Sequence, residues 1–365
     1  MTLRWVACAV TVSFPALFSC AAPARSTHAA EGAHSQEHKQ GERPCSLPIS
    51  EAWPRRVAGE ARECLAGQTQ GCVHAGWSLK MGLDGVKDRD VAVRYLQCAC
   101  EKGDALGCNA YGTMFEHGHG VPRDPVRAAS LYESACDRGI ADACGNLAVA
   151  YELGNGVHQD LQRSAKLADT ACVGGIASAC AELGYLYLNG AGVPKDLTRG
   201  LNLTMGACEA GDPTGCNNLA YAYEHGEGVS KDLHRALELY TRSCESDLPG
   251  GCYGAGAMHL NGRGTATNAA TAAELFKKGC DSETERGRDE PCLALARMVL
   301  RGMATQMKPS VVREVLDASC EKGVARACVD LAAYYAAVTR DTERARAAIK
   351  KACELGEAEA CRPQR

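Results

Sequence analysis

Cysteine recurs in this chain with a period of 36 residues. One series occupies positions 64, 100, 136, 172, 208, 244 and 280, and a second lies eight residues behind it at 72, 108, 144, 180, 216 and 252. The residues between them repeat with the same step, so that the stretch from Ala105 to Ile140 and the following 36 residues share one pattern. A fixed period of this length indicates a solenoid, in which each unit buries its apolar face against its neighbours.

Each unit has the pattern of two helices separated by a glycine turn. Counted from the second cysteine, apolar or small residues recur three, four and seven positions on, as at Leu183, Gly184 and Tyr187, which predicts a helical face. A tiny residue in the middle of that face predicts a closely crossing neighbouring helix; it is Gly112, Ala148, Gly184, Ala220 or Gly256 in successive units. Paired glycines such as Gly190 and Gly192 then end the helix.

An aspartate precedes the second helix in the same register of five units. These residues are Asp88, Asp124, Asp160, Asp196 and Asp232. Their side chains suit the free amides and positive end of a helix N-terminus, and one repeat of separation is too far for carboxylates to share a proton. We therefore interpret them as caps rather than catalytic acids. The whole pattern predicts an all-α fold, an αα-hairpin solenoid of about eight repeats over residues 49–365, with a capping helix from Ser50 to Ala66.

The paired cysteines predict one local disulfide per repeat. Zinc sites usually separate their cysteines by about two to four intervening residues or add histidines at fixed positions, whereas these pairs are separated by seven residues and have no partnering histidine, so no metal is assigned. Each bridge would clip the end of one helix to the start of the next and contribute roughly 2.5 kcal/mol. The predicted pairs are Cys64–Cys72, Cys100–Cys108, Cys136–Cys144, Cys172–Cys180, Cys208–Cys216, Cys244–Cys252, Cys280–Cys292, Cys320–Cys328 and Cys353–Cys361.

Cys45 and Cys98 have no partner in this register. Cys98 falls near the end of its helix and Cys45 before the start of the preceding equivalent helix, which places them about 20 Å apart. Two alternatives stay open: a mutual bridge if the N-terminal segment folds back, or a reactive or intermolecular thiol.

The N-terminus has the features of an export signal. Residues 1–24 combine Arg4 with an apolar run and small residues, which is typical of a cleaved signal peptide, and residues 25–48 form a polar linker. The sequence Leu17-Phe18-Ser19-Cys20 resembles a lipobox with Cys20 as lipid acceptor; cleavage after Ala24 is the alternative. Disulfides also favour an oxidising compartment. We expect an exported protein, in the periplasm, at the outer membrane as a lipoprotein, or secreted.

The units resemble a known repeat. Residues 216–229, CNNLAYAYEHGEGV, followed by Asp232 and Cys244, are similar to the Sel-one-like repeat in its disulfide-bridged form, found in the cysteine-rich, Hcp-like proteins of bacteria. The resemblance implies a curved solenoid similar to tetratricopeptide arrays, with the first helix of each pair on the concave side. It also implies an adaptor for peptides or proteins, although some Hcp-like members are classed as β-lactamases or penicillin-binding proteins.

The residues give little support to a hydrolase. Ser319-Cys-Glu-Lys322 is the only Ser-x-x-Lys tetrad and its companion motifs are missing, while His117 and His119 have no third zinc ligand in sight. A net charge of -4 gives no basic field for nucleic acid, and a membrane contact is expected only through the lipid anchor.

We predict a scaffold that binds a peptide or protein on its concave face, without a cofactor, and treat the β-lactamase as the alternative. Candidate ligand-binding residues are the polar first-helix positions Asn109, Asn146, Glu182, Asn217 and Asn218, whose side chains can donate and accept hydrogen bonds. No catalytic residue is assigned.

Overall fold

A computed structural model describes residues 45, 49–282, 289–303, 308–358, 360 and 361 of the chain. The chain divides into two units, Met1–Arg43 and Pro44–Arg365, and the described residues all belong to the second. The predicted signal peptide, Cys20 and the linker, apart from Cys45, lie outside the described residues. Within the described residues every regular element is a helix, and none of these helices is long and apolar enough to cross a membrane.

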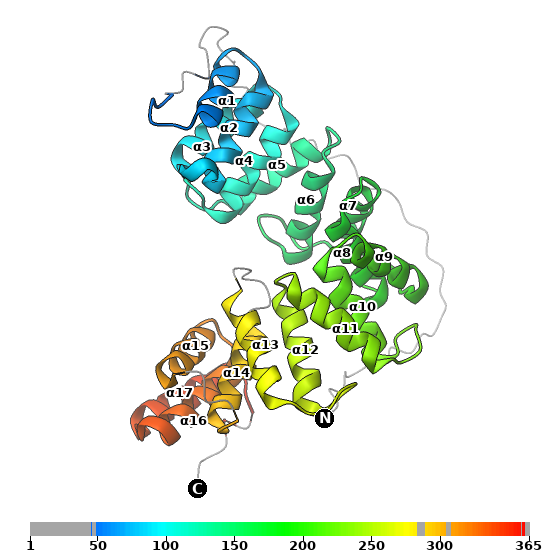
Figure 1. Ribbon diagram of the computed structural model, residues 1–365, viewed down its shortest axis with the longest axis vertical. Helices are drawn as coiled ribbons and strands as arrows, with labels where there is room; N and C mark the ends of the chain where they lie inside the picture. Colours follow the sequence, from blue (N-terminus) through cyan, green and yellow to red (C-terminus); the bar gives the residue numbers. More distant parts are fainter. Residues whose placement is uncertain (1–44, 46–48, 283–288, 304–307, 359, 362–365) are drawn as a thin grey trace, which may run out of the picture. The chain divides into compact units, whose positions relative to one another are not determined.

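Eight antiparallel helix hairpins follow one another along the second unit (Figure 1). Their first helices are α2 (Thr69–Met81), α4 (Ala105–His117), α6 (Ala141–Leu153), α8 (Ala177–Asn189), α10 (Pro213–His225), α12 (Pro249–Asn261), α14 (Asp289–Leu300) and α16 (Ala325–Tyr334). Their second helices are α3 (Arg89–Glu101), α5 (Pro125–Cys136), α7 (Leu161–Val173), α9 (Leu197–Glu209), α11 (Leu233–Glu245), α13 (Ala269–Asp281), α15 (Pro309–Glu321) and α17 (Thr342–Glu354). The predicted αα-hairpin solenoid of about eight repeats is confirmed.

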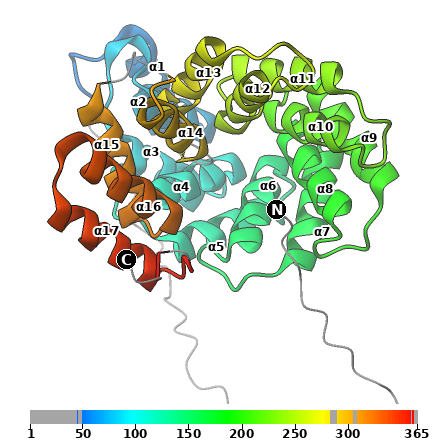
Figure 2. The same cartoon turned by 90° about the horizontal axis from the view of Figure 1, so that it is seen from below.

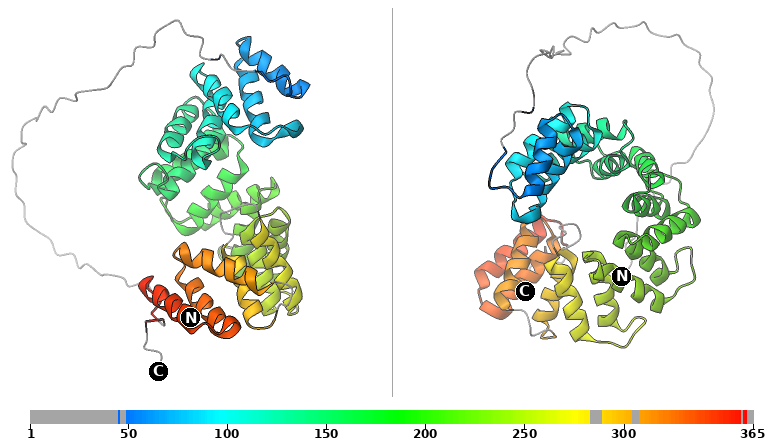
Figure 3. Two further views of the ribbon diagram at one scale, coloured as in Figure 1. Left: turned by 90° about the vertical axis from the view of Figure 1, so that its left-hand side faces the viewer. Right: turned by 45° about the horizontal axis from the view of Figure 1, so that its top comes forward.

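Neighbouring hairpins pack in chain order (Figure 2). Each first helix lies against its own second helix and against the second helix before it. First helices also contact their equivalents one repeat away, as α8 does with α10 and α10 with α12. The views in Figure 3 show the same succession from two further sides. The first helices from α8 to α16 therefore lie next to one another in chain order.

The capping helix is shorter than predicted. Helix α1 (Arg55–Leu65) begins after Pro54, whereas we expected it to begin after Ser50. Instead, the hydroxyl of Ser50 accepts a hydrogen bond from the amide of Ala52, and its carbonyl accepts one from the amide of Trp53, so that these residues form a turn. A residue before proline is biased away from the helical conformation, which explains why the helix starts only after Pro54.

The aspartate caps are confirmed. The side chains of Asp88, Asp124, Asp160, Asp196 and Asp232 each accept a hydrogen bond of 2.9–3.0 Å from the backbone amide three residues on. Asn268 caps α13 in the same way. Each carboxylate thus accepts a hydrogen bond from the first turn of the helix that follows it.

The two glycines of each turn have different tasks. Gly154 ends α6 with φ 68°, the left-handed conformation predicted for a helix terminus. Gly156 also has a positive φ of 78°, but a Cβ there would in addition collide with the carbonyl oxygen of Pro125, the first residue of α5 in the preceding repeat. The second glycine is therefore required by contact between repeats.

The tiny residue inside each first helix marks a close helix crossing, as predicted. A Cβ on Gly112 would lie 2.7 Å from Cε1 of Tyr132, and one on Gly256 would lie 2.6 Å from Cε1 of Phe276. Both aromatic rings belong to the second helix of the same hairpin. Large side chains of the second helix thus fill the space that the small residue leaves.

One disulfide per repeat is present. The bridges are Cys64–Cys72, Cys100–Cys108, Cys136–Cys144, Cys172–Cys180, Cys208–Cys216, Cys244–Cys252, Cys280–Cys292, Cys320–Cys328 and Cys353–Cys361, with Cα–Cα distances of 4.4–4.8 Å. The first eight join the end of one helix to the start of the next, and Cys353–Cys361 joins the end of α17 to the turn that follows it.

A tenth disulfide joins Cys45 to Cys98, with their Cα atoms 5.7 Å apart. The expected separation of about 20 Å was wrong, because Cys45 lies beside the C-terminal part of α3 instead of beyond the N-terminal end of α1. Trp53 instead packs on the core that contains Cys45 and Cys98, and its ring lies 6.2 Å from that of Tyr95 on α3. Of the two alternatives left open, the structure has the mutual bridge.

Candidate binding surface

The five candidate residues lie on consecutive first helices. Asn109 is on α4, Asn146 on α6, Glu182 on α8, and Asn217 and Asn218 on α10, and all five are partly buried. We call the surface formed by α6, α8 and α10 the first-helix surface.

Some of the amide groups join neighbouring repeats. Nδ2 of Asn146 donates a hydrogen bond of 3.0 Å to Oδ1 of Asn109, and Nδ2 of Asn218 donates one of 3.5 Å to the carbonyl oxygen of Ala181. A primary amide offers two donor hydrogens and a carbonyl with two lone pairs. These contacts therefore use only part of the hydrogen-bonding capacity of each side chain, so that the same residues can both order the repeats and contact a ligand.

Two hollows open on the first-helix surface. The first, of about 180 Å³, lies between α6 and α8 and is lined by Asn146, Glu182, Asp142, Ser178 and Thr214 among others. The second, of about 350 Å³, lies between α8 and α10 and is lined by Leu188, Asn189, Asn217 and Asn218 between two tyrosines. The structure thus places Asn146 with Glu182, and Asn217 with Asn218, in two neighbouring sites. Asn109 lines neither.

Sequence reasoning missed the tyrosines. Tyr185 of α8 is 45% exposed and Tyr221 of α10 is 49% exposed, and both line the second hollow. The ring of Tyr221 stacks on that of His225 with centroids 4.0 Å apart. Both tyrosines follow the second cysteine of their repeat by five residues, and the exposed Trp77 holds the same position in its own repeat. Aromatic residues are enriched at binding surfaces, so their recurrence at this position of the repeat could have indicated the surface from the sequence.

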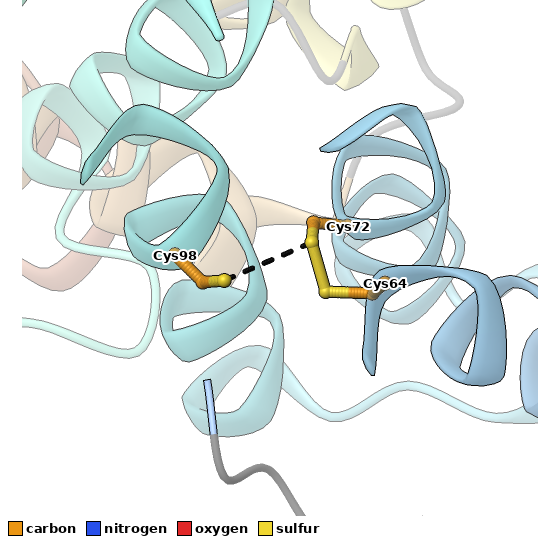
Figure 4. Close-up of side chains that lie close together, drawn as sticks. All are labelled: Cys64, Cys72 and Cys98. Carbon is orange, nitrogen blue, oxygen red and sulfur yellow. Dashed lines mark hydrogen bonds between the residues drawn. A yellow bond between two sulfur atoms is a disulfide. The ribbon is translucent and has the colours of Figure 1, made fainter. Parts of the chain in front are cut away.

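The residues considered for hydrolysis do not form a site. Ser319 lies within α15 with only 2% of its surface exposed, which keeps its hydroxyl from a β-lactam, and Lys322 pairs with Asp289 at 3.2 Å. The rings of His117 and His119 lie 5.5 Å apart. In the described part of the chain, one group of three or more metal-ligating side chains occurs. It consists of Cys64, Cys72 and Cys98 (Figure 4) and includes neither histidine.

The fold and this surface define an αα-hairpin repeat protein of the kind that presents an extended binding face. The Sel1 repeat matches seven segments, which are residues 70–104, 105–140, 141–172, 177–212, 213–248, 249–283 and 325–357. Together they cover more than half of the chain, which therefore belongs to the Sel1 repeat family, as the resemblance predicted.

Two solved structures show the same architecture. A protective antigen of uropathogenic Escherichia coli strains, displaying an SLR fold, is 26% identical over 83% of this chain and 65% of its own, with a TM-score of 0.53. A Sel1 repeat protein from Oxalobacter formigenes is 21% identical over 73% of this chain and 96% of its own, with a TM-score of 0.51. The chain thus spans just under two thirds of the antigen. No match was found among the curated proteins.

Proposed function

We propose that this protein is an exported scaffold that binds a peptide or protein partner along the first-helix surface. The observation that carries the proposal is the repetition of a polar hollow in neighbouring repeats, with Tyr185 and Tyr221 exposed at the second. The fold supports a protein-interaction role because repeat arrays use such extended surfaces to bind other chains. No cofactor is part of the proposal.

The chemistry of the two hollows suits an extended main chain. Asn217 and Asn218 present amides that can pair with both the N–H and the C=O of a peptide. The tyrosines beside them offer rigid apolar area with a polar tip. The carboxylates of Asp142 and Glu182 line the first hollow, so that the partner should present donors there, from its backbone or from a basic side chain.

Export is the second part of the proposal. Ten disulfides are typical of proteins that fold in an oxidising compartment. The lipobox-like residues before Cys20 support a lipid anchor, with release into the periplasm or medium as the alternative. Fractionation of cells with Cys20→Ala distinguishes the two: the variant should leave the membrane fraction if Cys20 is lipidated, and should fractionate like the natural chain if it is not.

Site-directed photo-crosslinking tests the surface. A photoreactive residue is placed at Tyr185, at Tyr221, or as a control at Val173, which is 84% exposed on the second helix α7. The probe is an extract of the bacterial envelope, followed by the purified protein that is captured. The same partner should be captured from both tyrosine positions and not from Val173.

The affinity for the purified partner then decides the proposal. Tyr185→Ala and Tyr221→Ala should each weaken binding about tenfold or more, as expected for a buried aromatic anchor. Val173→Ala should leave the dissociation constant unchanged. Equal capture from all three positions, or equal affinities of the three variants, would refute this surface. Turnover of nitrocefin by the oxidised protein would instead support the β-lactamase alternative.

A further inference from the structure

Basic side chains gather where the turn after α4 meets the end of α2 and the start of α3. The half-buried Lys80 lies in the last turn of α2, and its Nζ atom donates a hydrogen bond of 2.8 Å to Oγ1 of Thr113 on α4. The same ammonium stands 4.5 Å from the centroid of the Trp77 ring. Lys80 is thus held at the junction of two repeats, with one of its three N–H donors bonded to Thr113.

The turn after α4 brings His119 to the same junction. A Cβ on the next residue, Gly120, would lie 2.4 Å from the carbonyl oxygen of Arg89, so that the turn packs against the first residue of α3. Burial lowers the pKa of the His119 imidazole, and so do the like charges of Arg89, Lys80 and Lys87. Three elements therefore contribute positive charge to one place. We call Lys80, Lys87, Arg89 and His119 the basic cluster.

Carboxylates near the basic cluster are engaged in other contacts. Glu116 on α4 accepts a hydrogen bond of 2.6 Å from the hydroxyl of Tyr132, and Asp88 accepts one of 3.0 Å within the first turn of α3. Among the described residues, no member of the basic cluster forms an ion pair. Apart from Glu116, the charges that act on Lys80 and His119 are basic. The cluster therefore has an excess of positive charge.

The equivalent junction later in the array carries opposite charges. Arg263, in the turn after α12, forms an ion pair of 2.5 Å with Glu224, in the last turn of α10 and 39 residues before it. His119 follows Lys80 by the same 39 residues. Two bases thus occupy the positions at which the later junction has an ion pair. Because like charges repel, this arrangement lowers the stability of the junction, and a bound anion would remove that loss.

We propose that the basic cluster binds a phosphate group. Such a group carries about −1.5 to −2 charges near pH 7 and at least three acceptor oxygens, which suits donors that come from three elements. A lysine ammonium and an arginine guanidinium are common phosphate contacts, and Arg89 and Lys87 are exposed, so that the ligand can enter from solvent. The basic cluster lines neither hollow of the first-helix surface, so that this site is separate from the proposed partner site.

Phosphate titration of the oxidised full chain tests the site. Inorganic phosphate is the probe, chloride at equal ionic strength and pH is the reference, and the ring signals of labelled histidines are followed by NMR. The signal of His119 should shift along a saturable curve with phosphate alone. His259 is the internal control, because its Nδ1 atom is also buried without a hydrogen-bond partner among the described residues, but it lies four repeats further along on α12. Equal shifts of His119 with both anions would mean charge screening only and would overturn the proposal.

Two charge reversals separate phosphate binding from folding. Lys80→Glu should weaken phosphate binding at least about tenfold, because it removes a charged donor and adds repulsion. In phosphate-free buffer of low ionic strength its melting temperature should be equal to or above that of the natural chain, since a carboxylate then faces the basic cluster as Glu224 faces Arg263. Lys231→Glu, in the turn before α11, changes the net charge equally and should bind phosphate like the natural chain. Equal affinities of the two variants would refute the site.

A neutral substitution and a second ligand complete the test. Arg89→Gln changes an exposed residue at the start of α3, so that it should fold like the natural chain and still bind phosphate more weakly; unchanged affinity would count against the site. Methyl phosphate then distinguishes the two sources of the ligand. Binding as tight as that of inorganic phosphate supports a phosphate ester of a larger molecule as the occupant, and weaker binding supports free phosphate.

Discussion

Nδ2 of Asn146 on α6 donates a hydrogen bond of 3.0 Å to Oδ1 of Asn109 on α4. The two residues stand 37 positions apart in the sequence and belong to successive repeats. Nearest-neighbour contacts of this kind are the units of stability in a solenoid, because each repeat touches only those beside it. A residue selected as a ligand contact thus also links two repeats.

The hydrogen bond predicts an energetic coupling between these two asparagines. Asn146→Ala removes the donor and should lower the free energy of unfolding by about 1 kcal/mol, the usual net worth of such a bond. Asn109→Ala should cost a similar amount, and the double variant less than the sum, with a coupling of about 0.5–1.5 kcal/mol. Denaturant unfolding of the oxidised chain provides the measurement. Asn189→Ala is the control, because among the described residues the side chain of Asn189 donates its hydrogen bond to the carbonyl of Tyr185 in its own helix, so that it should not couple to Asn146.

The glycine turn between α6 and α7 predicts unequal costs for two neighbouring substitutions. Gly154→Ala should cost only the penalty of the left-handed conformation, about 1–2 kcal/mol. No collision adds to it, because the nearest atom to the new Cβ would be Cβ of Gln159 at 3.4 Å. Gly156→Ala meets the same penalty and also collides with the backbone of Pro125, so its total cost should be about 2–5 kcal/mol. Thermal unfolding of the two variants would rank them, and equal losses would show that the inter-repeat contact is unimportant.

The two kinds of disulfide should differ in the stability that they provide. Cys45–Cys98 spans 53 residues, whereas Cys172–Cys180 spans eight. In the chain-entropy treatment the longer loop contributes about 4 kcal/mol and the shorter about 2.5 kcal/mol. Cys45→Ser/Cys98→Ser should therefore lower the unfolding free energy more than Cys172→Ser/Cys180→Ser does. A larger loss from the short bridge would mean that strain or folded-state contacts outweigh loop entropy.

The sequence predicts most of this fold because its constraints are local and repeated. Asp196 caps the N-terminus of the helix that follows it, and Gly190 ends the helix that precedes it. Because equivalent residues recur in several repeats, these roles can be recognised in the sequence. Cys45 could not be placed in that way, since its position depends on how the chain before Pro54 turns back, which has no second copy. The hollow between Tyr185 and Tyr221 was also missed, because it arises from the packing of two helices rather than from either pattern alone.

Buried tyrosines predict a loss of stability at alkaline pH. The hydroxyl of Tyr132 on α5 donates a hydrogen bond of 2.6 Å to Glu116 on α4, and Tyr240 on α11 donates one of 2.8 Å to Glu224 on α10. Burial, together with the nearby carboxylate, raises the pKa of both tyrosines above their ordinary value of 10.0. The folded chain therefore keeps protons that the unfolded chain releases above about pH 10.

Stability from these two tyrosines should consequently be complete below pH 10 and should fall as the pH rises beyond it. Tyr132→Phe/Tyr240→Phe removes the titrating groups and should flatten the decline between about pH 10 and 11, although it costs about 1 kcal/mol per lost hydrogen bond at neutral pH. Tyr185→Phe/Tyr253→Phe, which changes two exposed tyrosines, is the matched control and should keep the slope of the natural chain. Identical slopes in both double variants would show that other groups govern alkaline unfolding.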